Sequence, residues 1–189
     1  NSVIGTDFVA KAAPDGYTLL LNPASHLTVP FFNKKMPYDA VKDFTPIIAA
    51  AYNNRCIVVH PSLPVQNLNE LIAYAKKNPG KLSYGVAASG SAQELAGDLL
   101  KFTTGIDMVP VPYKGGAPAM NDLLGGQIQM GIFVLADTLQ HIKTGRLRAL
   151  GIVEGRRSKA ASDIPTVAQA GVPGFAIPDQ WIGIFGPAG

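Results

Sequence analysis

The chain has 189 residues, of which 47% are hydrophobic and 15% are charged, a composition that excludes intrinsic disorder and can supply a buried core. Sixteen Lys and Arg residues against 13 Asp and Glu residues leave a net charge of +3, and the basic side chains are dispersed, which argues against a nucleic-acid-binding protein. No stretch approaches the roughly 18 apolar residues of a membrane span, so we expect no direct membrane insertion. Cys56 is the single cysteine, which excludes an internal disulfide.

The first 60 residues are predicted to form few regular elements. Residues 3–12 have a helical pattern, and the continuous apolar run of residues 17–21 is typical of a buried strand. Residues 22–28 are predicted as the loop at the carboxyl end of that strand. Residues 47–59 contain two apolar runs separated by a pair of asparagines, which we interpret as one long extended crossing.

Strands and helices alternate along the rest of the chain. Asn67 and Glu70 fit a capping box before a helix that ends near Asn78. Further strands are predicted over residues 82–86 and 108–112, from residue 128, and over residues 147–153 and 181–185. Helices are predicted after the first three of these strands, the last of them over residues 138–143, and a short helix over residues 166–170. This alternation is typical of the α/β class.

The order of the predicted elements indicates two lobes. If the chain leaves one sheet near residue 53 and returns to it near residue 152, residues 53–151 form a nearly complete α/β lobe. Residues 1–52 and 152–189 then belong to the other lobe.

Residues 82–100 are the most informative stretch of the chain. A short apolar strand passes through the small residues 87–90 into a helix, and Ser91 and Glu94 fit the S-x-x-E capping box that opens helices. Backbone N–H groups and the positive end of the helix dipole would face whatever lies above this loop, which predicts an anion cradle. The alternative is an ordinary strand-to-helix turn, in which Ser91 serves only as the N-cap.

A second strand-loop-helix unit follows the first. The strand of residues 108–112 leads into a glycine-containing turn over residues 113–117, and Pro118 suits the first turn of the next helix. Two such units in succession suggest ligand groups held at the carboxyl ends of strands in an open sheet. The sequence therefore predicts a crevice for a small anion, which also suits the mild excess of positive charge.

The enzyme alternative rests on Ser89 and Ser91, which lie at a strand-to-helix turn as the nucleophile of a hydrolase does. The surrounding residues fail the G-x-S-x-G pattern, and His60 and His141 lack partners at a catalytic spacing. The sequence also lacks a Gly-Lys-Ser/Thr phosphate loop, H-x-x-x-H and C-x-x-C. We therefore expect no enzyme activity, no metal site and no cofactor. A ligand-sensing domain of a regulatory protein stays open as an alternative, because a fold does not determine a function.

Several short motifs are spread along the chain in a specific order. They are PDGYT at 14–18, DFTPI at 43–47, NPGKLSYG at 78–85, VPYKGGAP at 111–118, LLGGQ at 123–127, LRAL at 147–150, DIPTV at 163–167 and AGVPGF at 170–175. In this order and spacing, the motifs resemble the substrate-binding proteins of tripartite tricarboxylate transporters, the Bug or TctC family. The resemblance covers essentially the whole chain.

The resemblance implies an α/β fold of the type II periplasmic-binding-protein kind, with two lobes joined by hinge strands. Members of the family have further elements before residue 1 and after residue 189, so we expect the first lobe to be incomplete. The resemblance also implies a periplasmic receptor that captures a small organic carboxylate in the cleft between its lobes. Such a receptor delivers the ligand to the membrane permease subunits of the transporter, and the signal peptide for export is not present in this chain.

The resemblance further implies which residues contact the ligand. They are Ser25 and His26 in the first lobe, and Ala88, Ser89, Gly90, Ser91, Tyr113, Lys114, Gly115, Phe133 and Asp137 in the second. Carboxylate oxygens would accept hydrogen bonds from backbone N–H groups and serine hydroxyls. Each polar candidate has an alternative role: His26 satisfies local backbone groups, Lys114 points to solvent, Asp137 caps the following helix, and Tyr113 packs between the lobes.

Overall fold

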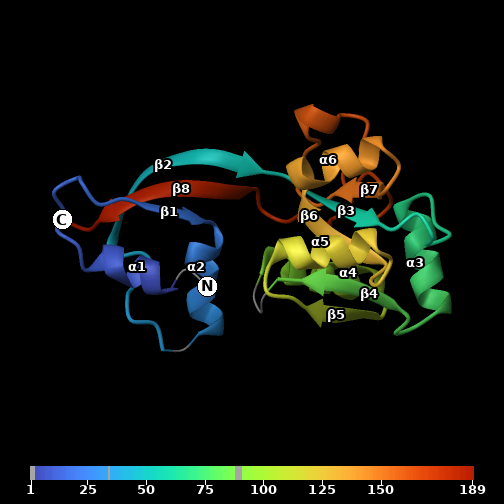
Figure 1. Cartoon of the computed structure of the whole chain (residues 1–189), viewed down its shortest axis with the longest axis horizontal. Helices are drawn as coiled ribbons and strands as arrows, with labels where there is room; N and C mark the ends of the chain where they lie inside the picture. The colour runs from blue at the N-terminus through green and yellow to red at the C-terminus, as the bar shows by residue number, and fades with distance from the viewer. Residues whose placement is uncertain (1–2, 34, 88–90) are drawn as a thin grey trace. The chain divides into compact units, whose positions relative to one another are not determined.

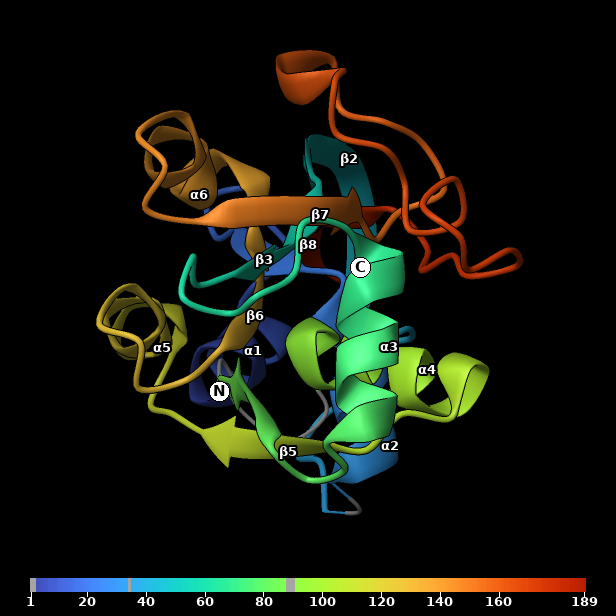
Figure 2. The same ribbon diagram turned by 90° about the vertical axis from the view of Figure 1, so that its right-hand side faces the viewer.

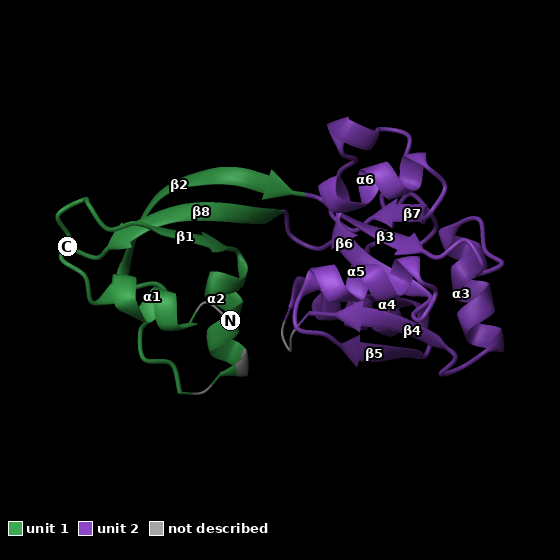
Figure 3. Ribbon diagram, viewed as in Figure 1, with its two compact units in different colours: residues 1–53, 180–189 green, residues 54–179 purple. Residues whose placement is uncertain are grey.

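The computed structural model of the chain describes residues 3–33, 35–87 and 91–189. Two compact units make up the chain: unit 1 contains Asn1–Asn53 and Gln180–Gly189, and unit 2 contains Asn54–Asp179 (Figure 3). The chain therefore passes between the units at two points. No helix in the described ranges is long and apolar enough to cross a membrane.

Unit 1 is built on a three-stranded antiparallel sheet in the order β1–β8–β2 (Figure 1). The strands are β1 (Leu20–Pro23), β2 (Phe44–Asn53) and β8 (Gln180–Pro187), and the helices are α1 (Val3–Ala10) and α2 (Ser25–Phe32). Strand β8 pairs with both neighbours, so segments from the two ends of the chain lie side by side. The buried core of unit 1 consists of Val9, Leu20, Tyr38, Phe44 and Phe185.

The start of unit 1 differs in part from the prediction. Helix α1 is present where the sequence indicates it. The first strand begins later than predicted, at Leu20, because its pairing with Phe185 of β8 sets the register. The predicted loop over residues 22–28 is wrong: from Ser25 the chain forms α2, since the buried side chain of His26 holds this segment against the core.

Unit 2 contains a five-stranded sheet in the order β5–β4–β6–β3–β7. The strands are β3 (Arg55–Val59), β4 (Leu82–Val86), β5 (Met108–Pro112), β6 (Met130–Val134) and β7 (Arg148–Ile152). Strand β4 runs parallel to β5 and β6, whereas β3 runs antiparallel to β6 and β7. The predicted strands of this region are confirmed, and β4 and β5 have the predicted bounds.

Helices cover both faces of this sheet (Figure 2). Helices α3 (Leu68–Lys77) and α4 (Ala92–Thr104) contribute to one buried cluster, and α5 (Gly116–Leu124) and α6 (Leu135–Lys143) contribute to another. The predicted capping box of α3 is present, with Asn67 Oδ1 accepting a hydrogen bond from the backbone of the box glutamate at 3.0 Å. These features confirm the α/β class.

Residues 152–179 belong to unit 2, although we expected them in the first lobe. Val167 and Phe175 from this segment are buried in the same cluster as α3 and α4. The segment contains one short helical turn, η1 (Lys159–Ala161), and turns in place of the helix predicted over residues 166–170. A long irregular segment carries no periodicity that indicates its packing partner, so only burial reveals that the return to unit 1 comes later in the chain.

Candidate functional site

The amino ends of three helices lie at one edge of the unit 2 sheet (Figure 1). Strands β4, β5 and β6 run in one direction, and α4, α5 and α6 follow them in the chain. The carboxyl ends of the strands and the amino ends of the helices therefore meet at this edge, which we call the carboxyl edge. Backbone N–H groups in the first turn of a helix have no partner within the helix and favour an anion.

A cavity of about 520 Å³ opens at the carboxyl edge. Its lining combines residues of α4, α5, β6 and α6: Gln93, Gly116, Ala117, Met120, Asn121, Phe133, Val134 and Asp137. Two of the predicted site residues, Phe133 and Asp137, are therefore brought together with the first turns of α4 and α5. The lining combines apolar side chains, such as Met120 and Phe133, with polar ones, such as Gln93 and Asn121, which suits a small ligand with an apolar body and charged ends.

The start of α4 agrees with the predicted capping box. Ser91 is the N-cap of α4, and its Oγ accepts a hydrogen bond from Glu94 N–H at 3.3 Å. The Ser91 hydroxyl can still donate its own proton to an acceptor, because accepting one bond leaves the O–H donor available. The predicted contacts at Ala88, Ser89 and Gly90 lie outside the described residues.

The loop between β5 and α5 holds Tyr113, Lys114 and Gly115. The Tyr113 hydroxyl donates to Asp122 Oδ2 at 2.7 Å, and its backbone N–H donates to the Val86 carbonyl at 2.8 Å. Desolvation and the neighbouring Asp122 carboxylate raise the pKa of Tyr113 to about 12. The Lys114 side chain is exposed. Gly115 is the N-cap of α5 with a φ of 121°, a conformation that residues with a side chain rarely adopt.

Phe133 and Asp137 differ sharply in burial. Phe133 is 4% exposed and belongs to the cluster beneath α5 and α6. Its ring packs over Gly131, where a Cβ atom would overlap it. Asp137 is exposed in the first turn of α6, whose N-cap position is occupied by Val134, so Asp137 is not the N-cap. Its negative charge suits a donor group of a ligand and disfavours a carboxylate beside it.

His26 lies inside unit 1, where both of its ring nitrogens have partners. The distances are 3.1 Å from Nδ1 to Asn22 Nδ2 and 2.8 Å from Nε2 to the Ala40 carbonyl. An amide NH₂ can only donate and a carbonyl can only accept, which assigns the proton to Nε2. The ring also packs against Phe44 and Phe185, and burial lowers its pKa. These contacts give His26 a role in packing unit 1, and a ligand contact at His26 stays a prediction.

Ser25 is the first residue of α2 and is half-buried. Its carbonyl accepts a hydrogen bond from the Thr28 hydroxyl at 3.4 Å. The predicted ligand contact of Ser25 likewise stays a prediction.

Arg55 and Glu154 form a polar pair that we did not predict. The Arg55 backbone N–H lies 3.1 Å from Glu154 Oε1 and 2.9 Å from Glu154 Oε2, and Glu154 is 1% exposed. Burial raises the pKa of Glu154 and lowers that of Arg55. The one signal in the sequence is an arginine that opens the otherwise apolar run RCIVV at 55–59.

The described residues contain no group of three or more His, Cys, Asp or Glu side chains placed to hold a metal ion. Cys56 is fully buried in β3, and desolvation raises the pKa of its thiol to about 12. Cys56 therefore packs as a small hydrophobic residue, as the sequence indicates.

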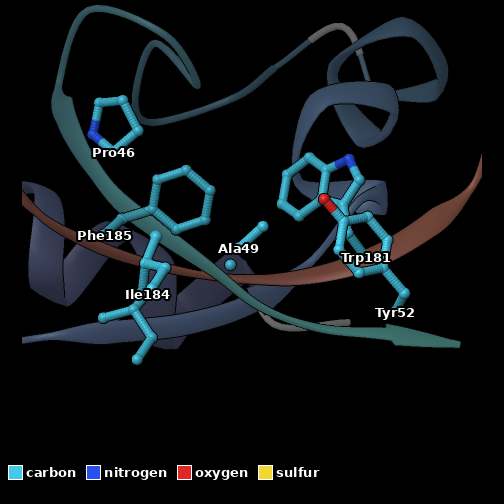
Figure 4. A pocket seen from close by; sticks show the side chains of 8 residues that line it. Pro46, Ala49, Tyr52, Trp181, Ile184 and Phe185 are labelled. Carbon is cyan, nitrogen blue, oxygen red and sulfur yellow. The ribbon is translucent and has the colours of Figure 1, made fainter.

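A second, apolar pocket of about 270 Å³ lies on the sheet of unit 1 (Figure 4). Residues of β2 and β8 line it: Pro46, Ile48, Ala49, Tyr52, Trp181, Gly183, Ile184 and Phe185. Its lining contains no charged side chain, and the hydrogen-bond donors among its side chains are those of Tyr52 and Trp181. The carboxyl edge of unit 2 is the better candidate for an anionic ligand.

Comparison with known proteins agrees with the resemblance. The family model described as tripartite tricarboxylate transporter family receptor matches residues 1–189. Among solved structures, the chain is similar to Rpa4515 of R. palustris with adipate, with a TM-score of 0.91, 37% identity and coverage of 99% of this chain and 62% of that one. It is also similar to the periplasmic binding protein BugD, with a TM-score of 0.87, 36% identity and coverage of 99% and 62%.

A third similar structure is MatC (Rpa3494) from Rhodopseudomonas palustris with bound malate, with a TM-score of 0.83, 29% identity and coverage of 99% of this chain and 64% of that one. The chain spans a little over half the length of the curated relatives it matches first, 56% and 58%. The family model covers the chain from end to end, and the TM-scores of these three structures lie between 0.83 and 0.91. The chain therefore belongs to the tripartite tricarboxylate transporter receptor family.

Proposed function

We propose that this protein is a periplasmic solute receptor that captures a small organic carboxylate at the carboxyl edge of unit 2. It delivers the ligand to the membrane permease subunits of a tripartite tricarboxylate-type transporter. The observation that carries the proposal is the meeting of the first turns of α4, α5 and α6 around one cavity. The adipate and malate of the similar structures support the choice of carboxylate.

In this proposal the ligand is held by hydrogen bonds and not by chemistry. Backbone N–H groups at the starts of α4 and α5, together with the Ser91 hydroxyl, donate to the carboxylate oxygens. Gly115 leaves the start of α5 open to close approach, and the exposed Lys114 adds positive charge. Phe133 supplies an apolar base for the body of the ligand.

The remaining predicted contacts complete the proposed site. Tyr113 positions the β5–α5 loop through its bond to Asp122, and Asp137 meets a hydroxyl or amino group of the ligand. Ala88, Ser89 and Gly90 precede the α4 cap in the chain and are proposed as further ligand contacts. Ser25 and His26 are proposed as contacts contributed by unit 1.

The test compares two helix caps. Ser91→Ala and Asn67→Ala each remove an N-cap hydrogen bond, which lowers the free energy of unfolding by about 1 kcal/mol. Asn67 caps α3, which follows the oppositely directed β3 and so begins at the far edge of the sheet. We expect adipate or malate to raise the melting temperature of the wild type and of Asn67→Ala in a concentration-dependent way.

Ser91→Ala is expected to lose most of that ligand-induced rise. Isothermal titration calorimetry with the same acids gives the matching affinities. An equal ligand response in the two variants would remove Ser91 from the site, and no response in the wild type to any small carboxylate would overturn the proposed function.

A further inference from the structure

The first residue of β3 lies at the carboxyl edge. Because β3 runs antiparallel to β6, Arg55 pairs with Val134, the last residue of β6. Val134 lines the cavity described above. Arg55 is therefore adjacent in the sheet to the proposed binding site, on the strand next to β6.

Two of the three nitrogens of the Arg55 guanidinium are buried without a hydrogen-bond acceptor. Its Nε and Nη1 atoms are shielded from solvent, and no residue in the described part of the chain accepts a hydrogen bond from either. Ion pairs among the described residues join Lys11 to Asp7, Lys42 to Asp39 and Arg156 to Asp179, and none includes Arg55. Buried hydrogen-bond donors that lack an acceptor are unfavourable, so these two nitrogen atoms call for an explanation.

Glu154 does not supply the missing acceptor. Both of its carboxylate oxygens are directed to the backbone N–H of Arg55, at 3.1 and 2.9 Å, and not to the guanidinium. Its charge attracts the Arg55 side chain over a longer range. The two unmet donors of Arg55 thus belong to a planar cation that is weakly hydrated and well suited to pair with a carboxylate.

We propose that Arg55 binds the second carboxylate of a dicarboxylic acid, whose first carboxylate is held at the start of α4, and that it selects doubly charged acids over singly charged ones. This inference rests on the proposed function. Strand β6 separates β3 from β4, which leads to α4, so two inter-strand spacings, about 10 Å in all, separate the two positions. A short dicarboxylic acid extends over much of that distance.

The first measurement is the melting temperature of Arg55→Met without ligand. Methionine keeps the backbone N–H that Glu154 accepts and fills similar apolar volume, but it removes the unpaired charge. We expect the melting temperature to rise or stay unchanged. A clear fall would mean that the guanidinium is held by a structural partner, which would contradict the proposal.

The second measurement compares adipate with hexanoate, which has the same chain length and one carboxylate, by isothermal titration calorimetry on the full chain. The wild type is expected to bind adipate about tenfold or more tightly than hexanoate, the range of one charged hydrogen bond. Arg55→Met is expected to lose that preference while its affinity for hexanoate stays within about threefold.

Arg148→Met is the matched control. Arg148 also opens a strand, β7, but its Nη1 donates to the Val65 carbonyl at 2.7 Å and it lies at the opposite edge. Its loss is expected to lower the melting temperature and to leave the preference for adipate intact. An unchanged preference in Arg55→Met would overturn the Arg55 assignment and leave the receptor standing. Failure of the wild type to bind either acid would overturn both the Arg55 assignment and the proposed receptor function.

Discussion

Unit 2 covers both faces of its five-stranded sheet with helices, whereas the three-stranded sheet of unit 1 leaves large apolar side chains at the surface. Among the described residues, 11 of the 14 exposed large hydrophobic side chains belong to unit 1, although it is the smaller unit. Apolar burial is the main source of folding free energy. Unit 1 is therefore expected to be the less stable part, and the carboxyl edge lies on the more stable one.

The contrast has a consequence for binding. Ligand groups bind best where the donors are held in place before the ligand arrives. The capped start of α4 and the Tyr113 to Asp122 bond hold the carboxyl edge within a well-packed unit. Local opening is expected first in unit 1, where few apolar contacts oppose it.

Cavity-forming substitutions test this contrast with the largest expected effect. Leu100→Ala removes a fully buried side chain from the core of unit 2 and is expected to lower the free energy of unfolding by about 2–5 kcal/mol. Leu21→Ala truncates a side chain that is 65% exposed on β1, and we expect it to change the free energy of unfolding by less than about 0.5 kcal/mol. Urea denaturation followed by circular dichroism measures both. Equal effects would show that Leu21 is covered in solution.

Mild acid is expected to lower the stability of unit 1, by less than Leu100→Ala lowers the stability of unit 2. Burial lowers the pKa of His26, so the unfolded chain takes up a proton near the usual value of about 6.5 while the folded unit does not. The stabilisation is present above that pH and is lost as the pH falls through it, by at most about 1.4 kcal/mol per pH unit. In unit 2, burial raises the pKa of Glu154, and this gives a pH dependence of stability with the opposite sign. Lowering the pH protonates Glu154 and relieves the cost of burying its charge.

Hydrogen exchange at about pH 7.5 and about pH 5.5, corrected for intrinsic rates, separates the two contributions. Amides of β1 and α2 are expected to lose protection in acid, and amides of β3 are expected to keep it. His26→Gln should lower the stability of unit 1 at both values and abolish its pH dependence. A loss of protection shared by both units, or one that persists in His26→Gln, would refute this role of His26.

The smallest effect on stability is expected at the apolar pocket of unit 1. Ile48 is 59% exposed on β2 and lines that pocket (Figure 4). Ile48→Ser is expected to change the free energy of unfolding by less than about 0.5 kcal/mol, while reducing self-association at high concentration, because exposed apolar patches promote association. Analytical ultracentrifugation of the two proteins over a concentration series measures the difference. Destabilisation by more than about 1 kcal/mol would instead mean that this face is packed.

The sequence predicted unit 2 far better than unit 1. Each strand of unit 2 is short, apolar and bounded by turn residues, and the caps at Asn67 and Ser91 place the helices that follow. In unit 1 the run of residues 17–21 is apolar throughout, so its pattern does not define the strand bounds. Pairing with β8, which comes more than 150 residues later, selects Leu20–Pro23 instead.

The candidate site was predicted in the same uneven way. The Ser91 cap of α4 and the glycine turn before α5 were predicted because helix caps and glycine turns are local signals that the sequence itself carries, while ligand contacts there stay a prediction. Arg55 was missed because a single arginine at the start of a strand is unremarkable until its burial and lack of an acceptor are known. Those two properties depend on every element packed around it.

The sequence alone determined the α/β class, the family and the starts of α3 and α4, because strand patterns, helix caps and short motifs are each formed by residues that are close together in the chain. Tertiary structure decided the registers of unit 1, the membership of residues 152–179 in unit 2 and the environment of Arg55. These features depend on contacts between residues that are far apart in the sequence. Local patterns do not encode such contacts, since pairing and burial become specific only when the elements pack together.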